Sequence, residues 1–261
     1  MSPFIIHEDE DLLVISKPDG ITVNRADTTR DEETVQDWSE KKLHIENVSP
    51  EISEEEKNTY NSPAYFAWAF QERGGIVHRL DKETSGILLL AKNPDAFAEL
   101  QQQFRERTVQ KFYTALAHGD VTPSEGEINV PVGRLPWNRK QFGVVAGGRE
   151  AQTYYTTKKR LLLTLDKKKE PMTLLSLEPK TGRTHQIRVH LQYIHHPIFA
   201  DFLYAGRKAS RDDREVLGRV FLHASSITFK HPRTGEKLHF TCPLTPELQN
   251  ILEKYCKTRE D

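Results

Sequence analysis

The 261-residue chain is poor in cysteine and has no long apolar run. Its two cysteines, Cys242 and Cys256, are separated by thirteen residues, which matches no zinc motif and offers no disulfide framework. We therefore expect a reducing compartment, the cytoplasm. No apolar stretch approaches the length of a membrane span, and the acidic N-terminal residues contain no signal-peptide hydrophobic region. The sequence thus predicts neither membrane insertion nor a disulfide-stabilised secreted fold.

A charge excess is also lacking, since the formal net charge is −1, and this at first argues against a nucleic-acid-binding protein. The distribution changes that conclusion. Residues 1–76 carry 7 basic and 17 acidic side chains, whereas residues 77–261 carry 30 basic and 21 acidic ones. A basic body with an acidic N-terminal segment is compatible with a phosphate-rich partner, although solvated charged surfaces would produce the same pattern.

The most informative segment is His-Arg-Leu-Asp-Lys-Glu-Thr-Ser-Gly-Ile-Leu-Leu-Leu-Ala, residues 78–91. Asp81 follows His78 and Arg79 and precedes a turn of small residues and an apolar run that predicts a buried strand. An unpaired buried carboxylate costs several kcal/mol, so its presence needs a reason. Asp81 either caps a turn or acts as a catalytic group, and the adjacent arginine and strand favour a fixed, ionised carboxylate.

A second segment is Lys-Thr-Gly-Arg-Thr-His-Gln-Ile-Arg-Val-His, residues 180–190, where a glycine turn leads into a predicted helix over 184–194. The start of such a helix can bind an anion through its backbone N–H groups. Arg188 lies beside the apolar stripe, where a carboxylate partner is expected. The alternative is an amphipathic helix with a solvated polar face. The histidine spacings do not form the i, i+4 pair of a metal-binding helix, so we predict no metal site.

A third segment is Gln-Lys-Phe-Tyr-Thr-Ala, residues 110–115. In a strand, Lys111 and Tyr113 share one face and Phe112 points the opposite way, into the core. Tyr113 is either an ordinary half-buried strand residue or a ring that stacks on a base near a reacting carbon.

The whole pattern predicts an α+β fold, because short strands with hairpin-like connections outnumber the helices. Strands are expected at 4–6, 12–15 and 87–91, and helices at 32–44, 94–107 and 246–255. Residues 45–62 are polar, acidic and interrupted by proline, and we interpret them as an exposed insertion or loop.

Four segments together resemble the RluA family of RNA pseudouridine synthases. They are residues 10–18 (Glu-Asp-Leu-Leu-Val-Ile-Ser-Lys-Pro), 78–93, 110–113 and 182–191, and they occur in family order. The resemblance implies the pseudouridine synthase core: a long, bent, mixed and largely antiparallel sheet with flanking helices and a central catalytic cleft. It implies one catalytic domain over residues 1–261, carrying the acidic insertion and lacking the S4 domain of many relatives.

The resemblance also assigns roles. Asp81 corresponds to the essential aspartate, Arg188 to the basic residue paired with it, and Tyr113 to the tyrosine that packs on the target base. Arg79 resembles the arginine that enters the helix stack in place of the flipped uridine. The other residues expected to contact RNA are His78, Lys111, Arg183 and His185.

The implied activity is isomerisation of uridine to pseudouridine in structured RNA, by a monomer acting without a cofactor or metal. Large-subunit ribosomal RNA is the expected substrate and tRNA the alternative. A non-catalytic RNA-binding or chaperone relative is a further possibility, which the Asp81, Tyr113 and Arg188 set disfavours, since binding alone does not require that trio. A metal-dependent hydrolase would need clustered ligands that the sequence does not offer.

Overall fold

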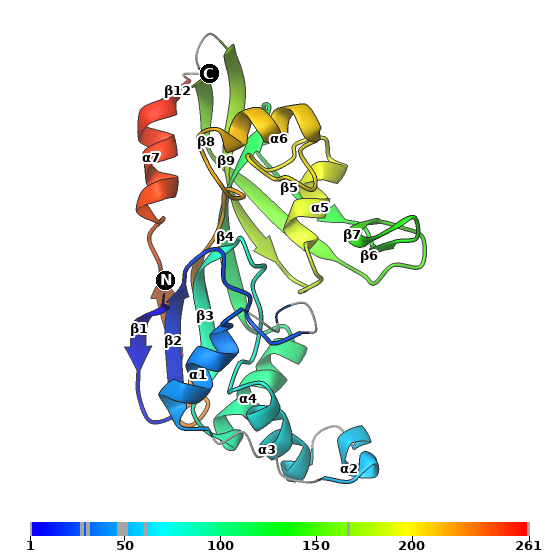
Figure 1. The fold of residues 1–261 in the computed structure, drawn as a ribbon, viewed down its shortest axis with the longest axis vertical. Helices are drawn as coiled ribbons and strands as arrows, with labels where there is room; N and C mark the ends of the chain where they lie inside the picture. The colour runs from blue at the N-terminus through cyan, green and yellow to red at the C-terminus, as the bar shows by residue number, and fades with distance from the viewer. Residues whose placement is uncertain are drawn as a thin grey trace. The chain divides into compact units, whose positions relative to one another are not determined.

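The computed structural model describes residues 2–26, 29, 32–45, 52–59, 62–165 and 168–259. The chain forms two compact units (Figure 1). The first comprises Met1–Val109 and Ile227–Cys242, and the second comprises Gln110–Ser226 and Pro243–Asp261.

The sheet of the first unit begins with a hairpin. Strands β1 (Phe4–Glu8) and β2 (Leu12–Lys17) pair antiparallel. The Asp9 carboxylate closes the turn between them by accepting hydrogen bonds from two backbone N–H groups, those of residues 11 and 12, at 2.8 and 2.7 Å. Strand β3 (Ser85–Ala91) pairs antiparallel with β2 and is buried along its whole length. Strand β11 (Lys237–Thr241) pairs with β10 (Leu222–Lys230), whose last residues belong to this unit.

The described part of the first unit also contains four helices. They are α1 (Val35–Leu43), α2 (Glu54–Asn58), α3 (Pro63–Glu72) and α4 (Pro94–Arg105). Helix α4 contacts β3, and α2 contacts α3. Helices α3 and α4 both start with proline, which has no N–H to leave unsatisfied at that position, after a side-chain N-cap from Ser62 or Asn93. Phe97 and Leu100 of α4 are buried with Leu89 of β3 in one apolar cluster.

The second unit is built on long antiparallel strands. They are β4 (Gln110–His118), β5 (Glu125–Asn129), β8 (Gln152–Leu165), β9 (Lys168–Pro179) and β12 (Cys256–Thr258). Strand β9 pairs with β4 and β8, and β8 also pairs with β5 and β12. A separate two-stranded hairpin is formed by β6 (Val132–Leu135) and β7 (Asn138–Val144).

Three helices complete the second unit. They are α5 (Gln186–Tyr193), α6 (Arg207–Arg214) and α7 (Pro246–Tyr255). Val189 of α5 packs with Val132, Ala151 and Tyr204 in a small apolar cluster beside the hairpin. In the described ranges, no helix combines the length and the apolar character needed to cross a membrane.

The α+β class is confirmed, and the helices expected at 32–44, 94–107 and 246–255 are present as α1, α4 and α7. The helix expected over 184–194 begins two residues later, at Gln186. Residues 45–62 are interpreted above as an exposed insertion or loop. Within them Glu54–Asn58 form α2 and not a loop, residues 46–51, 60 and 61 lie outside the described residues, and the insertion stays a prediction. A single catalytic domain over 1–261 stays a prediction.

Candidate active site

Asp81 lies in a tight turn of the first unit, immediately before a rigid strand. Its carbonyl accepts a hydrogen bond from the Thr84 N–H at 3.1 Å, which closes the turn. Asp81 is half-buried, whereas Thr84 and Ser85 are 2% and 0% exposed as they enter β3. The position of the Asp81 carboxylate is therefore set by backbone that continues directly into the core.

Lys17 fixes this turn from the neighbouring strand. Its side chain is 0% exposed, although lysine is almost never fully buried without partners. The ammonium donates hydrogen bonds to three backbone carbonyls, those of Pro18 (2.7 Å), Ile21 (2.9 Å) and Lys82 (3.1 Å). The N–H of Gly20 also donates to the Lys82 carbonyl, at 2.9 Å. The turn after β2 and the turn that carries Asp81 are thus joined by one buried charge.

His78 fixes the other side of the Asp81 segment. Its Nε2 accepts a hydrogen bond from the Leu89 N–H at 2.9 Å, so the ring is neutral with its proton on Nδ1. The ring also stacks on Phe104, with 4.9 Å between centroids. His78 therefore anchors the segment to β3 and α4, and its expected contact with RNA stays a prediction. Arg79, the next residue, is exposed.

Arg188 of the second unit has a carboxylate partner, as its position in the sequence predicted. Asp201 is paired with it. The Nε and Nη2 of Arg188 donate to the two Asp201 carboxylate oxygens at 2.7 and 2.8 Å, with both side chains buried. The guanidinium also lies 5.0 Å from the centre of the Tyr204 ring. Asp201 Oδ1 accepts two further hydrogen bonds, from the N–H groups of Leu203 and Tyr204. A bidentate pair of this kind holds a guanidinium in one orientation.

Sequence reasoning missed Asp201 because it belongs to the segment after α5, thirteen residues from Arg188. A weak signal was available, since Asp201 is a lone acid in a run of apolar residues from Ile198 to Tyr204. Such an acid needs a cation or several N–H donors, and here it has both.

His185 and Arg183 precede α5 in the same unit. His185 has a left-handed backbone (φ 56°), which explains why the helix starts after it. Its Nδ1 lies 2.9 Å from the Tyr204 hydroxyl, and its ring contacts the edge of Phe142. The Arg183 N–H donates to Gln186 Oε1 at 3.0 Å, and its Nε donates to the Glu150 carbonyl. These contacts are internal, so an RNA contact by either residue stays a prediction.

His190 is a fully buried residue of α5. Thr153 Oγ1 lies 2.9 Å from its Nδ1, and the Val130 carbonyl lies 3.2 Å from its Nε2. A carbonyl only accepts, so Nε2 carries the proton and Thr153 donates to Nδ1. Burial lowers the pKa of His190, against a smaller raising effect of the Val130 carbonyl. The ring is therefore a neutral link between α5 and β8.

Lys111 and Tyr113 both lie on strand β4, as predicted, but the burial of the residue between them differs from the prediction. Tyr113 is 9% exposed, opposite Leu177 of β9, whereas Phe112 is only half-buried, so the expectation that Phe112 fills the core is wrong. Burial lowers the pKa of Lys111 to about 8, although the nearby Glu178 carboxylate acts in the opposite direction. Part of the Lys111 population is therefore neutral at mildly alkaline pH.

Two histidine–carboxylate clusters were not detected in the sequence. Within the described residues, Asp9, Asp11 and His231 form one in the first unit, and His118, Glu170 and Asp213 form one in the second. In each cluster the donor atoms lie within 4.8 Å of one another. Asp213 is 0% exposed and its Oδ2 lies 2.9 Å from His118 Nε2. Asp213 also accepts from the Ala200 N–H, so this cluster attaches α6 to the rest of the unit.

Comparisons with known proteins agree with these motifs. The family model described as RNA pseudouridylate synthase matches residues 11–193. The chain is 36% identical over 252 residues to the "Ribosomal large subunit pseudouridine synthase C" of Buchnera aphidicola, covering 95% of this chain and 69% of that protein. The Pasteurella multocida protein of the same name is 36% identical over 251 residues, covering 95% and 66%.

A solved structure gives the same fold. "Human RNA Pseudouridylate Synthase Domain Containing 1" aligns with a TM-score of 0.70 and 24% identity, over 100% of this chain and 91% of that chain. At this identity the likeness establishes the architecture alone.

Proposed function

This chain belongs to the RluA-type RNA pseudouridine synthases, and from that membership we propose that its substrate is uridine in large-subunit ribosomal RNA. The enzyme isomerises uridine to pseudouridine in RNA. The observation that carries the ribosomal assignment is the set of relatives named for large-subunit synthase activity. The tRNA alternative has no comparable support.

The reaction rearranges one nucleotide. The bond from ribose C1′ to base N1 breaks, the bond from C1′ to base C5 forms, and the C5 proton is lost while N1 gains one. No electrons are transferred and no group is donated, so we propose that no cofactor takes part. The target base must first leave its stack, at a cost of a few kcal/mol that contacts in the pocket must offset.

We propose Asp81 as the catalytic carboxylate. Its support is the family motif together with its half-buried position in a turn tied to Lys17 and β3. A preorganised carboxylate reacts without a reorganisation cost, whether it attacks the sugar or the base or removes a sugar proton.

We propose that Tyr113 packs against the target base and helps to move the C5 proton, and that Arg188 keeps Asp81 ionised. Asp201 takes up two N–H groups of Arg188. A guanidinium has five N–H donors, so it can serve a second carboxylate as well. Asp201 is then the residue that positions Arg188.

For RNA contact we propose Arg79 as the residue that enters the vacated stack, supported by its exposure, and Lys111 as a phosphate contact. His78, Arg183 and His185 support the site through the internal contacts described above and are proposed to touch RNA as well. We further propose a cytoplasmic monomer.

The test is pseudouridine mapping of large-subunit ribosomal RNA and tRNA from the host with the gene deleted, then restored as wild type, Asp81→Asn or Asp95→Asn. Asp95 is an exposed aspartate in the first turn of α4, which makes it a matched control. We expect one or a few ribosomal sites to vanish, and to return with wild type and Asp95→Asn only. Loss confined to tRNA would refute the substrate assignment. Sites restored by Asp81→Asn would refute the catalytic one.

A further inference from the structure

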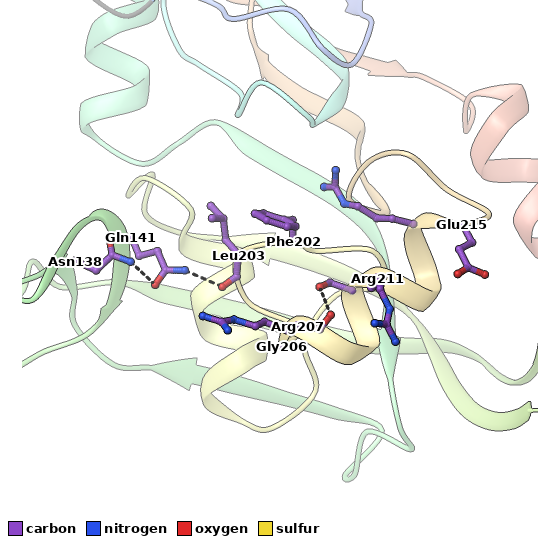
Figure 2. Close-up of a pocket in the computed structure, with 10 residues that line it drawn as sticks. Asn138, Gln141, Phe202, Leu203, Gly206, Arg207, Arg211 and Glu215 are labelled. Carbon is purple, nitrogen blue, oxygen red and sulfur yellow. Dashed lines mark hydrogen bonds between the residues drawn. The ribbon is translucent and has the colours of Figure 1, made fainter.

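A pocket lies on the second unit between the end of the β6–β7 hairpin and helix α6 (Figure 2). Its volume is about 760 Å³, within the range of pockets that enclose small ligands, about 300–1,000 Å³. The hairpin contributes Asn138 and Gln141. The segment leading into α6 and the helix itself contribute the remaining lining residues, which are Phe202, Leu203, Gly206, Arg207, Ser210, Arg211, Arg214 and Glu215.

Both walls of this pocket are held in place. Gln141 Nε2 donates to the Leu203 carbonyl at 3.0 Å, which attaches the hairpin to the segment before α6. On the opposite side of α6, buried Asp213 pairs with His118. With Asp213 turned inward, the face that carries Arg207, Arg211 and Arg214, spaced i, i+4 and i+7, lines the pocket.

The charge of this face suits an anion. Within the described part of the chain, the Arg207 side chain has no hydrogen bond or ion pair. Arg214 donates hydrogen bonds to two backbone carbonyls, those of Ala200 and Gly218, both at 3.0 Å. The acids nearby are Asp212, whose Oδ1 is 3.5 Å from Arg211, and Glu215 in the lining. The pocket lining thus contains three arginines and one glutamate, and the Arg207 side chain is available to an anion. Two arginines at i, i+4 repel each other, and a phosphate between them would relieve this.

The pocket also offers a stacking surface. Phe202 is 68% exposed, which is unusual for a phenylalanine, and Arg214 lies 5.7 Å from the centre of its ring. In Figure 2, Phe202, Leu203 and Arg207 lie between the hairpin end and α6. Trp137, next to the lining residue Asn138, is 79% exposed. Exposed aromatic rings beside arginines are what proteins use to bind unstacked bases and their phosphates.

We propose that this pocket binds an unpaired nucleotide of the substrate RNA, away from the target uridine, with its base on Phe202 and its phosphate on Arg207 and Arg211. The proposal rests on the proposed function for the identity of the RNA. It assigns to α6 a role in substrate affinity and choice, separate from the chemistry at Asp81.

The test measures binding in the Asp81→Asn background, so that it does not depend on turnover. The probes are a transcript of the large-subunit ribosomal RNA, a single-stranded RNA 12-mer and uridine monophosphate. The variants are Arg207→Ala with Arg211→Ala, Phe202→Ala, and Lys208→Ala as control. Lys208 is exposed on α6 but does not line the pocket.

We expect the double arginine variant to weaken binding of both RNAs about tenfold or more and to reduce the slope of log K against log salt by about one to two. Phe202→Ala should weaken binding with no change in that slope, because stacking releases no counterion. Lys208→Ala should have little effect. Ultraviolet cross-linking of wild type to the 12-mer should place an adduct on the tryptic peptide that ends at Arg207.

The proposal that the pocket binds RNA would be refuted by unchanged RNA affinity in both pocket variants. It would also be refuted if Lys208→Ala lost as much RNA affinity as they do. Uridine monophosphate binding as tight as the 12-mer would assign the pocket to a free nucleotide and overturn the proposal. A wild-type protein that binds RNA through the pocket yet makes no pseudouridine would refute the proposed function alone, so the two failures are distinguishable.

Discussion

Replacing Lys17 by methionine should destabilise the protein and impair catalysis together, although Lys17 is not proposed to touch RNA. The change removes the ammonium that donates to the carbonyls of Pro18, Ile21 and Lys82. The Lys82 carbonyl keeps the Gly20 N–H, so two carbonyls lose this donor. An unsatisfied buried polar group costs about 1–3 kcal/mol, which gives roughly 2–6 kcal/mol for the pair.

Methionine also avoids the cost of burying a charge, which offsets part of that loss. We therefore expect the free energy of unfolding to fall by about 2–4 kcal/mol and Tm by roughly 5–15 °C. The Asp81 turn loses its tie to β2, and a displacement of about 1 Å lowers kcat by about 10²-fold. Urea denaturation and single-turnover pseudouridine formation measure the two effects.

Lys82→Met is the matched control, because it makes the same chemical change in the same turn. The Lys82 ammonium is exposed and pairs with the equally exposed Glu32, so its loss should change stability by at most about 0.5 kcal/mol. If Lys17→Met is as stable as Lys82→Met and equally active, the buried ammonium does not hold the turn.

Four further predictions follow, three on single side chains and one on the histidine–carboxylate clusters. The pKa of Lys111 is about 8, so Lys111 loses its charge between pH 7 and 9 and the RNA affinity of the wild type should fall over that range. The RNA affinity of Lys111→Arg, measured by filter binding, should not change with pH. The same pH dependence of affinity in both proteins would contradict this. The lowered pKa of His190 means that the unfolded chain takes up a proton near pH 6.5 before the folded one does. Stability should therefore fall as the pH drops below about 6.5. In thermal denaturation, the Tm of His190→Gln should depend less steeply on pH than the Tm of the wild type. Asp201→Asn leaves Arg188 buried without its full partner and should cost about 3–5 kcal/mol in urea denaturation, which a stable variant would disprove. Treatment with a chelator should leave turnover unchanged; activity lost and restored by zinc would implicate a histidine–carboxylate cluster.

Elements with a strong local signal could be predicted from the sequence. Helix α4 has Phe97, Leu100 and Phe104 on one face, and Asn93 followed by proline marks its start. These features act within a few residues, so a periodic pattern detects them. The start of α5 could not be predicted as well, because it depends on the left-handed His185 and on contacts of Gln186 with a distant strand, at Gln152 and Thr153.

The candidate site could be predicted only in part, because a sequence motif identifies a residue but not the distant residue that contacts it. The motifs identify Asp81, Tyr113 and Arg188 as the residues to consider, and the position of Arg188 predicts a carboxylate near it. Which carboxylate is decided by the path of the chain after α5, which brings Asp201 to the guanidinium. No spacing in the sequence encodes that path.

Lys17 is the strongest example of what a side-chain pattern cannot detect. At the end of a strand and before proline, a lysine is normally interpreted as a solvent-exposed charge. Here it is fully buried, because backbone carbonyls from two turns converge on its ammonium. Carbonyl groups are present at every residue, so their convergence leaves no mark in composition or periodicity. A sequence pattern can therefore miss the residues that position a catalytic turn even where it identifies the catalytic residue. A buried charge that donates to several backbone carbonyls is the structural feature by which to find them.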